Sequence, residues 1–258
     1  MSELPGLTDA RPLTIAVVVG VMILAGLVHG TLGLGFPMIA TPLLSLMTDV
    51  RSAILITLLP TVAVNVLSIL KGGRWNQSVR QFLPLMAFVT CGSVAGSWVL
   101  SVTDPGPFRL VLAFSIVLYL SVNRFGGLKL SWITRYRRGS LIGFGFVAGF
   151  LAGTVNVMVP VLIIYTLEMS LAPVVMVQVF NLCFVTGKVS QMGIFWNQGL
   201  FNADVAVATL PLALIAAVAL ALGMIVRERV AAETYRRWLR KTLWVMAALL
   251  VAQFAILP

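Results

Sequence analysis

The sequence has few charged residues. Only 10% of its 258 residues are charged, whereas soluble globular domains average about 25%. Charges this sparse cannot cover a water-facing surface. Together with a hydrophobic fraction of 60% and a mean hydropathy of +1.03, they exclude a soluble enzyme, a disordered chain and a nucleic-acid-binding protein. We therefore expect an all-α integral membrane protein with the lipid bilayer as its surroundings.

Residues that carry out catalysis or hold cofactors are also scarce. The chain has one histidine, His29, and two cysteines, Cys91 and Cys183, which form no CxxC pair. All eight carboxylates lie in or near expected loops and termini, and no Walker loop is present. We therefore expect no enzyme activity, no metal site, no cofactor and no ATP-driven transport by this chain alone.

Negative charge is scarcer than positive charge, with 8 acidic against 18 basic residues. The basic residues occur in short runs between apolar stretches, a pattern that encodes membrane orientation rather than binding to nucleic acid. If the basic loop 124–139 is cytoplasmic, only Arg11, Arg51 and Arg109 fall outside, and Lys188 lies within an apolar segment. This arrangement predicts a multi-pass membrane protein with both termini on the outer side.

The two halves of the chain resemble each other. Residues 26–37 (GLVHGTLGLGFP) match residues 149–160 (GFLAGTVNVMVP) at an offset of 123 positions. Further matches follow in the same order, and they pair Trp75 with Trp196, Pro84 with Pro211, Gly96 with Gly223 and Arg109 with Arg236. Several matches in one order predict an internal repeat.

Each half is expected to contain five helical elements. The predicted elements are 13–32, 37–48, 51–71, 81–101 and 107–123 in the first half and 140–156, 160–168, 172–193, 204–226 and 236–256 in the second. An odd number of elements per half inverts the second half, as in many secondary transporters. The expected domains are a polar N-terminus 1–12, an inverted repeat 13–123, a linker 124–139 and a second repeat 140–258, with roughly eight to ten membrane segments.

The second element of each half is short and follows a segment rich in glycine. At about 10 residues it covers about half of the membrane core. We predict unwound segments followed by half-helices, whose free N–H groups favour an anion. The residues expected to break the helices are Gly30, Gly35, Pro37, Gly153 and Pro160. The alternative is that the glycines permit close helix packing and the prolines make kinks.

Polar residues within the apolar segments are further candidates. Lys188 is expected to contact an anionic substrate or to gate, or else to snorkel toward the membrane surface near Trp196. His29 is the group expected to titrate if protons drive transport, and a structural histidine is the alternative. The expected substrate-binding residues are His29, Thr31, Gly33, Asn65, Thr154, Asn156, Asn181 and Lys188. Some of these polar side chains are expected to join helices instead.

The two interrupted segments, each G-x-x-x-G-T followed by a proline, resemble those of the TauE/SafE sulfite exporter family. The resemblance implies a secondary transporter of the bacterial inner membrane, with both termini then in the periplasm, that exports a small sulfur-containing anion such as sulfite or an organosulfonate. The anion would bind near the membrane midplane between the two half-helix starts. Two alternatives are a thiosulfate importer of the same family and a membrane-embedded structural or assembly subunit. The expected partners are the anion and the bilayer, with a homodimer left open.

Overall fold

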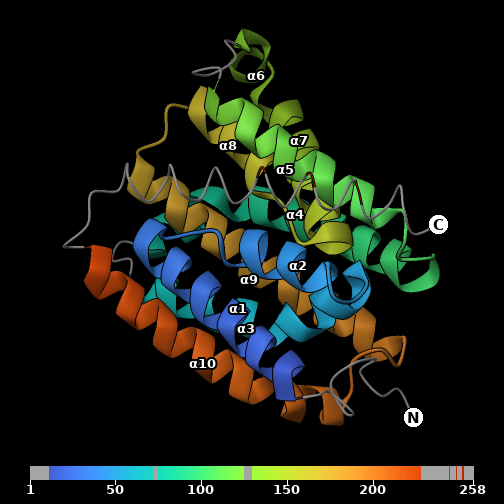
Figure 1. Ribbon diagram of the computed structural model, residues 1–258. Helices are drawn as coiled ribbons and strands as arrows, with labels where there is room; N and C mark the ends of the chain where they lie inside the picture. The colour runs from blue at the N-terminus through green and yellow to red at the C-terminus, as the bar shows by residue number, and fades with distance from the viewer. Residues whose placement is uncertain are drawn as a thin grey trace.

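The protein is a bundle of α-helices (Figure 1). The computed structural model describes residues 12–71, 75–124 and 130–227, together with positions 244, 248 and 252, and these ranges contain no strand. The helices are α1 (Pro12–Leu32), α2 (Phe36–Ser45), α3 (Val50–Lys71), α4 (Trp75–Val102), α5 (Phe108–Arg124), α6 (Ser131–Arg135), α7 (Arg137–Val155), α8 (Val159–Glu168), α9 (Pro173–Asn197) and α10 (Ala203–Arg227). The all-α membrane fold predicted from the sequence is confirmed.

Nine of the ten expected elements correspond to observed helices. Their ends follow the sequence closely, because proline lies in the first turn of α1, α2, α8 and α9, where the missing N–H removes no helical hydrogen bond. The predicted linker 124–139 is shorter than expected, since α6 and the start of α7 lie within it. The tenth element, 236–256, falls outside the described residues except for the single positions 244, 248 and 252.

Helix length separates two kinds of element. Six helices in the described ranges are long and apolar enough to cross a membrane: α1, α3, the part of α4 from Arg80, α7, α9 and α10. The shorter apolar helices are α2, α8 and residues 108–121 of α5. Both helices that follow a glycine-rich segment are therefore too short to cross, as the sequence predicts.

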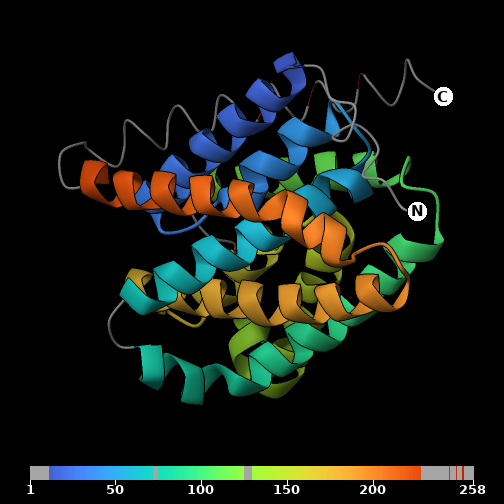
Figure 2. The same cartoon turned by 90° about the horizontal axis from the view of Figure 1, so that it is seen from below.

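Helices of one half pack against helices of the other half. In both views α1 lies beside α10 (Figures 1 and 2). Helix α7, which the sequence matches predict to be the counterpart of α1, packs on α4, the predicted counterpart of α10. Helix α9 contacts both α4 and α3, and α3 also contacts α10. The first long helix of each half therefore has its main partner in the opposite half.

Two glycines expected to break helices are in fact helical. Gly30 lies within α1 and Gly153 within α7. A side chain at Gly30 would collide with the carbonyl of Leu220 on α10, and one at Gly153 would collide with the carbonyl of Ser93 on α4. The prediction that these two glycines unwind the chain is wrong, because each instead lets two helix backbones approach closely.

Contacts between chain segments define one end of the bundle. Arg51, at the start of α3, donates to the carbonyl of Leu100 near the end of α4, at 2.9 Å. Arg109 of α5 donates to the carbonyl of Thr48, just after α2, at 3.1 Å. The end of α2 therefore lies beside the starts of α3 and α5 and the end of α4.

In the second half of the chain, the short helix α8 turns back in a similar way. Glu168, the last residue of α8, accepts a hydrogen bond from the amide of Leu130 at 3.1 Å. Leu130 directly precedes α6, and α6 is followed at once by α7. Helix α8 therefore runs back to the end of the bundle from which α7 enters, so that α7 and α8 form a hairpin interrupted at its tip.

Candidate functional site

The first break separates α1 from α2 at Gly33, Leu34 and Gly35. Gly33 has φ of 79° and Gly35 has φ of 113°, both in the left-handed region that glycine adopts without steric cost. Pro37 then lies in the first turn of α2. The predicted interruption is therefore present, although it begins three residues later than expected because the helix continues past Gly30.

His29 and Asn181 hold the first break together. The Nδ1 atom of His29 accepts the amide hydrogen of Phe36 at 3.3 Å, which leaves Nε2 to donate to Oδ1 of Asn181 at 3.1 Å. The Nδ2 group of Asn181 donates to the carbonyls of Gly33, at 3.0 Å, and Val177, at 2.8 Å. Both side chains are buried. Both ring nitrogens and both amide atoms are therefore engaged in joining α1, α2 and α9.

The second break separates α7 from α8 at Asn156, Val157 and Met158. Asn156 has φ of 62°, a left-handed conformation that asparagine tolerates better than most residues. Its Nδ2 group donates to the hydroxyl oxygens of Thr41 on α2, at 2.7 Å, and Thr57 on α3, at 3.3 Å. The second break is thus held by helices of the first half, as the first break is held by α9 of the second half.

One buried acceptor at the second break is not used. The Thr57 hydroxyl donates its hydrogen to the carbonyl of Ala53 at 2.8 Å, so it must accept from Nδ2 of Asn156. This assignment leaves Oδ1 of Asn156 pointing elsewhere, and in the described part of the chain that atom has no hydrogen-bond partner. A buried polar atom without a partner is unfavourable, so Oδ1 of Asn156 is a free hydrogen-bond acceptor at this break.

Lys188 and Gln191 bind the end of α7 just before the second break. The ammonium group of Lys188 donates to the carbonyl of Ala152 at 3.3 Å and to Oε1 of Gln191. The Nε2 group of Gln191 donates to the carbonyl of Gly153 at 2.8 Å. These are carbonyls of the last turn of α7, where a cation also meets the negative end of the helix dipole. Lys188 is only 1% exposed, so it is buried rather than snorkelling toward the surface.

The two breaks lie close together along α9. Asn181 contacts the first break and Lys188 contacts the end of α7 before the second. These two residues are seven positions apart on one helix, a rise of about 10 Å. Asn181 and Lys188 therefore hold the first break and the end of α7 about 10 Å apart along α9.

Both short helices begin with free amide groups. Within the described ranges, the amides of Leu34 and Met38 at the first break have no acceptor, and neither do those of Met158 and Val161 at the second. Unpaired N–H groups at a helix start, together with the helix dipole, attract negatively charged groups. The chemistry of both breaks therefore suits an anion.

Three predicted site residues have all their recorded bonds within their own helix. The hydroxyl of Thr31 donates to the carbonyl of Val28, and that of Thr154 donates to the carbonyl of Phe150, both at 2.9 Å. The Nδ2 group of Asn65 donates to the carbonyl of Thr61 at 2.7 Å. Within the described part of the chain, the side chains of Thr31, Asn65 and Thr154 therefore make no hydrogen bond to the residues of either break.

Polar atoms on α3 are nevertheless left unused. Oδ1 of Asn65 and the hydroxyls of Thr61 and Ser68 are buried and have no partner within the described part of the chain. Thr61, Asn65 and Ser68 follow Thr57 by 4, 8 and 11 positions, so all of them lie on the same face of α3 as Thr57. This face leads away from the second break, which makes α3 a candidate lining for a path through the bundle.

Three contact residues are absent from the predicted binding set. Thr41 and Thr57 contact Asn156, and Gln191 contacts the end of α7. Gln191 could have been found from its position three residues after Lys188, which places both on one face of α9. Thr41 lies in a short apolar helix, and nothing in its sequence context indicates a partner 115 positions away.

Comparison with known proteins assigns the family. Neither a curated protein nor a solved structure matches the chain. The family model described as sulfite exporter TauE/SafE matches residues 18–253, which is nearly the whole chain and includes both breaks. The chain therefore belongs to the TauE/SafE sulfite exporter family, whose members are membrane transporters of anions.

Proposed function

We propose that this protein exports a small sulfur-containing anion, sulfite or an organosulfonate, and binds it between the first turns of α2 and α8. One observation carries the proposal. Two interrupted helix hairpins, each with free amide groups, are held by residues of α9 that lie about 10 Å apart along that helix. Oxyanions present several acceptor oxygens, which suits donors that converge from two sides.

Lys188 supplies the positive charge of the proposed site through its position at the end of α7. Its ammonium group is fixed by Ala152 and Gln191, so it acts as a nearby charge rather than as a free arm that follows the substrate. A buried cation within a membrane segment marks a path for ions in many transporters. A charge held in this way attracts the anion without a tight direct pair, and the anion is released readily.

The proposed mechanism uses hairpins that enter from opposite ends. Helix α2 returns to the end of the bundle where α4 finishes, and α8 returns to the end where α7 begins. Helix α7 runs in the same direction as α4, because Gly149 faces Val89 and Gly153 faces Ser93. This supports the predicted inversion of the halves. We propose that the anion reaches each break from a different side in turn.

The direction of transport follows from the membrane potential. An interior that is negative pushes an anion outward with about 2.3 kcal/mol per charge for each 100 mV. Export therefore needs no coupling ion, whereas import of the same anion would need one. The hydrogen bonds of His29 fit export without a coupling proton. Both of its ring nitrogens are already bonded in the first break, so neither is free to accept a transported proton.

The test of transport is efflux from proteoliposomes that contain the purified chain. Vesicles loaded with labelled sulfite are expected to lose it in a saturable manner, faster with a potential that is negative inside. Parallel vesicles carry thiosulfate, sulfoacetate, sulfolactate, taurine or sulfate. Thiosulfate uptake without sulfite efflux would reject export of sulfite, and the absence of transport for every anion would favour a structural subunit.

A backbone substitution tests the site itself. Replacing Met38 with its α-hydroxy acid analogue turns its amide into an ester and removes the free N–H at the start of α2 while keeping the side chain. We expect about a tenfold to hundredfold loss of sulfite affinity, the effect of one hydrogen bond to a charged group. The same replacement at Met22, within α1, removes a helical hydrogen bond and should lower stability without this loss. Equal affinity in both variants would move the anion away from α2.

A further inference from the structure

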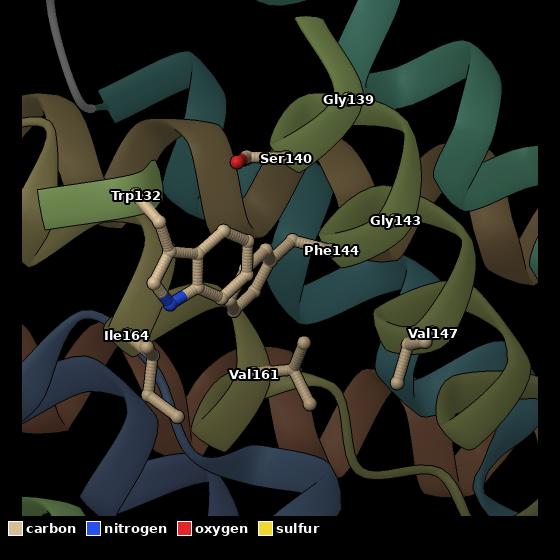
Figure 3. Close-up of a pocket in the computed structure, with 8 residues that line it drawn as sticks. All are labelled: Trp132, Gly139, Ser140, Gly143, Phe144, Val147, Val161 and Ile164. Carbon is tan, nitrogen blue, oxygen red and sulfur yellow. The ribbon is translucent and has the colours of Figure 1, made fainter. Parts of the chain in front are cut away.

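A cavity of about 340 Å³ lies between α6, α7 and α8, and its floor reaches Val161 in the first turn of α8. Trp132 of α6 forms one side, Gly139 and Gly143 of α7 form another, and Val161 and Ile164 of α8 form the floor (Figure 3). The size falls within the range of about 300–1,000 Å³ of pockets that hold small ligands. Its lining is almost wholly apolar, so an apolar part of a ligand fits it.

Two glycines create this cavity. Gly139 and Gly143 are one helical turn apart on α7, and a Cβ atom added at either would meet no atom of the described chain within 4 Å. Neither glycine is required for close packing or for a left-handed backbone. Their missing side chains leave a groove along α7 that the described part of the protein does not fill.

One polar atom inside the groove has no partner. The Ser140 side chain is 3% exposed, and its hydroxyl has no hydrogen bond within the described part of the chain. In Figure 3 its oxygen points away from α7 toward the side where Trp132 lies. A buried hydroxyl without a partner is unfavourable, so this atom indicates a ligand with a polar group at this end of the groove.

Positive charge gathers at the same end. Arg135 ends α6, and Arg137 and Arg138 form the first turn of α7, directly before Gly139. All three arginine side chains are exposed. The first amides of α7 add the positive end of a helix dipole. The nearby carboxylate of Glu168 accepts the amide of Leu130, so it has a partner of its own.

We propose that this groove binds an anionic phospholipid of the surrounding bilayer. The acyl chain lies along Gly139, Gly143 and Val147, and the phosphate group meets the start of α7, the arginines and the Ser140 hydroxyl. A free phosphate ion would leave the apolar lining empty, and a zwitterionic lipid would gain less from three arginines. Basic pockets between membrane helices recognise anionic headgroups in this way.

The repeat supplies a matched comparison within the chain. Gly20 of α1 corresponds to Gly143 at the offset of 123, and a Cβ atom added there also meets nothing within 4 Å. The counterpart of Ser140, however, is Val17, and residues 12–15 carry no charge. The first half thus has the glycine without the polar group and the arginines, and we expect no lipid site there.

The first test fills the groove. Full-length protein is purified in detergent, mixed with phosphatidylglycerol or phosphatidylcholine, and analysed by native mass spectrometry for bound lipid. Wild type is expected to hold phosphatidylglycerol at least about fivefold more tightly than phosphatidylcholine. Gly143→Leu is expected to abolish this preference, whereas Gly20→Leu keeps it.

The second test removes charge. Each arginine near an anionic surface contributes about a fivefold gain in affinity, so Arg137→Gln with Arg138→Gln should weaken phosphatidylglycerol binding by about 25-fold. Lys71→Gln, a substitution of an exposed lysine at the end of α3, serves as the control for charge alone and should change little.

Three results would overturn the proposal. The first is equal binding of both lipids by wild type. The second is unchanged phosphatidylglycerol binding by Gly143→Leu. The third is a lowered melting temperature of Gly143→Leu in lipid-free detergent, which would mean that another part of this chain already fills the groove. None of these measurements depends on sulfite transport, so the lipid site and the proposed function stand or fall separately.

Discussion

The two breaks perform the same backbone task with different residues. The first uses Gly33 and is held by a closed set of bonds in which every polar atom of His29 and Asn181 is engaged. The second uses Asn156 at the equivalent position and leaves one of its oxygens free. Two segments of similar sequence therefore both interrupt a helix, while the side chains that hold the two breaks differ.

Charge is also divided unequally between the breaks. Lys188 and Gln191 bind carbonyls at the end of α7, whereas the positions in α3 that correspond to them, at an offset of 121, are Leu67 and Leu70. The first break therefore has no cation of its own on α3. We infer that the first break serves mainly as a rigid support and that the second supplies the positive potential for the anion.

The sharpest way to break this comparison is Lys188→Met. The change removes the charge from the second break and leaves the α7 carbonyls with fewer donors. We expect the initial rate of sulfite efflux per folded protein to fall about a hundredfold, or ~2.7 kcal/mol. Gln191→Leu removes a donor to α7 but keeps the charge, and it should lose transport much less. Normal efflux by Lys188→Met would show that the charge is not needed.

The next largest effect is expected on stability at the first break. His29→Leu leaves the amide of Phe36 and Oδ1 of Asn181 without partners, and each buried orphan costs about 1–3 kcal/mol. We therefore expect the free energy of unfolding to fall by about 2–3 kcal/mol, measured by denaturant titration in detergent. In a double-mutant cycle with Asn181→Leu, the two losses should be strongly less than additive. Additive losses would contradict the closed bond set.

Exchanging the break residues tests whether the positions are equivalent. Asparagine tolerates the backbone of Gly33, but a Cβ atom there would approach the Val177 side chain to 2.8 Å. Gly33→Asn should therefore lower stability by about 1–2 kcal/mol, as overpacking does. Asn156→Gly keeps the backbone and loses two hydrogen bonds, so it should be milder. A larger loss for Asn156→Gly would show that the two side-chain bonds of Asn156 matter more than the space beside Gly33.

The smallest predicted effect concerns the contact between the second break and α2. Thr41→Val removes the hydroxyl that accepts from Asn156, and bonds between membrane helices average about 0.6 kcal/mol. We expect a slight decrease in melting temperature and normal sulfite affinity. Thr166→Val, whose hydroxyl donates within α8 to Leu162, is the matched control. A large loss of affinity in Thr41→Val would place Thr41 against the substrate.

Much of the fold could be predicted from the sequence because the residues that start or interrupt helices act locally. Proline at helix starts and glycine or asparagine at the breaks are visible without knowing any contact, and the starts of α1, α2, α8 and α9 follow the prolines. Gly30 and Gly153 show where this fails. Glycine serves close helix packing as well as unwinding, and only the facing backbones of α10 and α4 decide between the two.

The contacts of the site could be predicted only in part. A lysine within an apolar run indicates that it has a partner, but the sequence does not say that Lys188 binds the carbonyl of Ala152, 36 positions earlier. The predicted set included His29, Gly33, Asn156 and Asn181, which the structure brings to the breaks. Thr31, Asn65 and Thr154 look the same in sequence, and their bonds within their own helices are decided by rotamer and packing.

The interleaved packing of α1 with α10 has a consequence for synthesis. Helix α1 ends at Leu32, and the surface that receives its glycines begins near Ala216 on α10. About 180 residues separate the end of α1 from Ala216 on α10. They are translated after α1, at about 5–20 residues per second. Helix α1 must therefore remain in lipid without α10, its main partner, for about ten seconds or more, and the packing between these two helices forms only once α10 has been made.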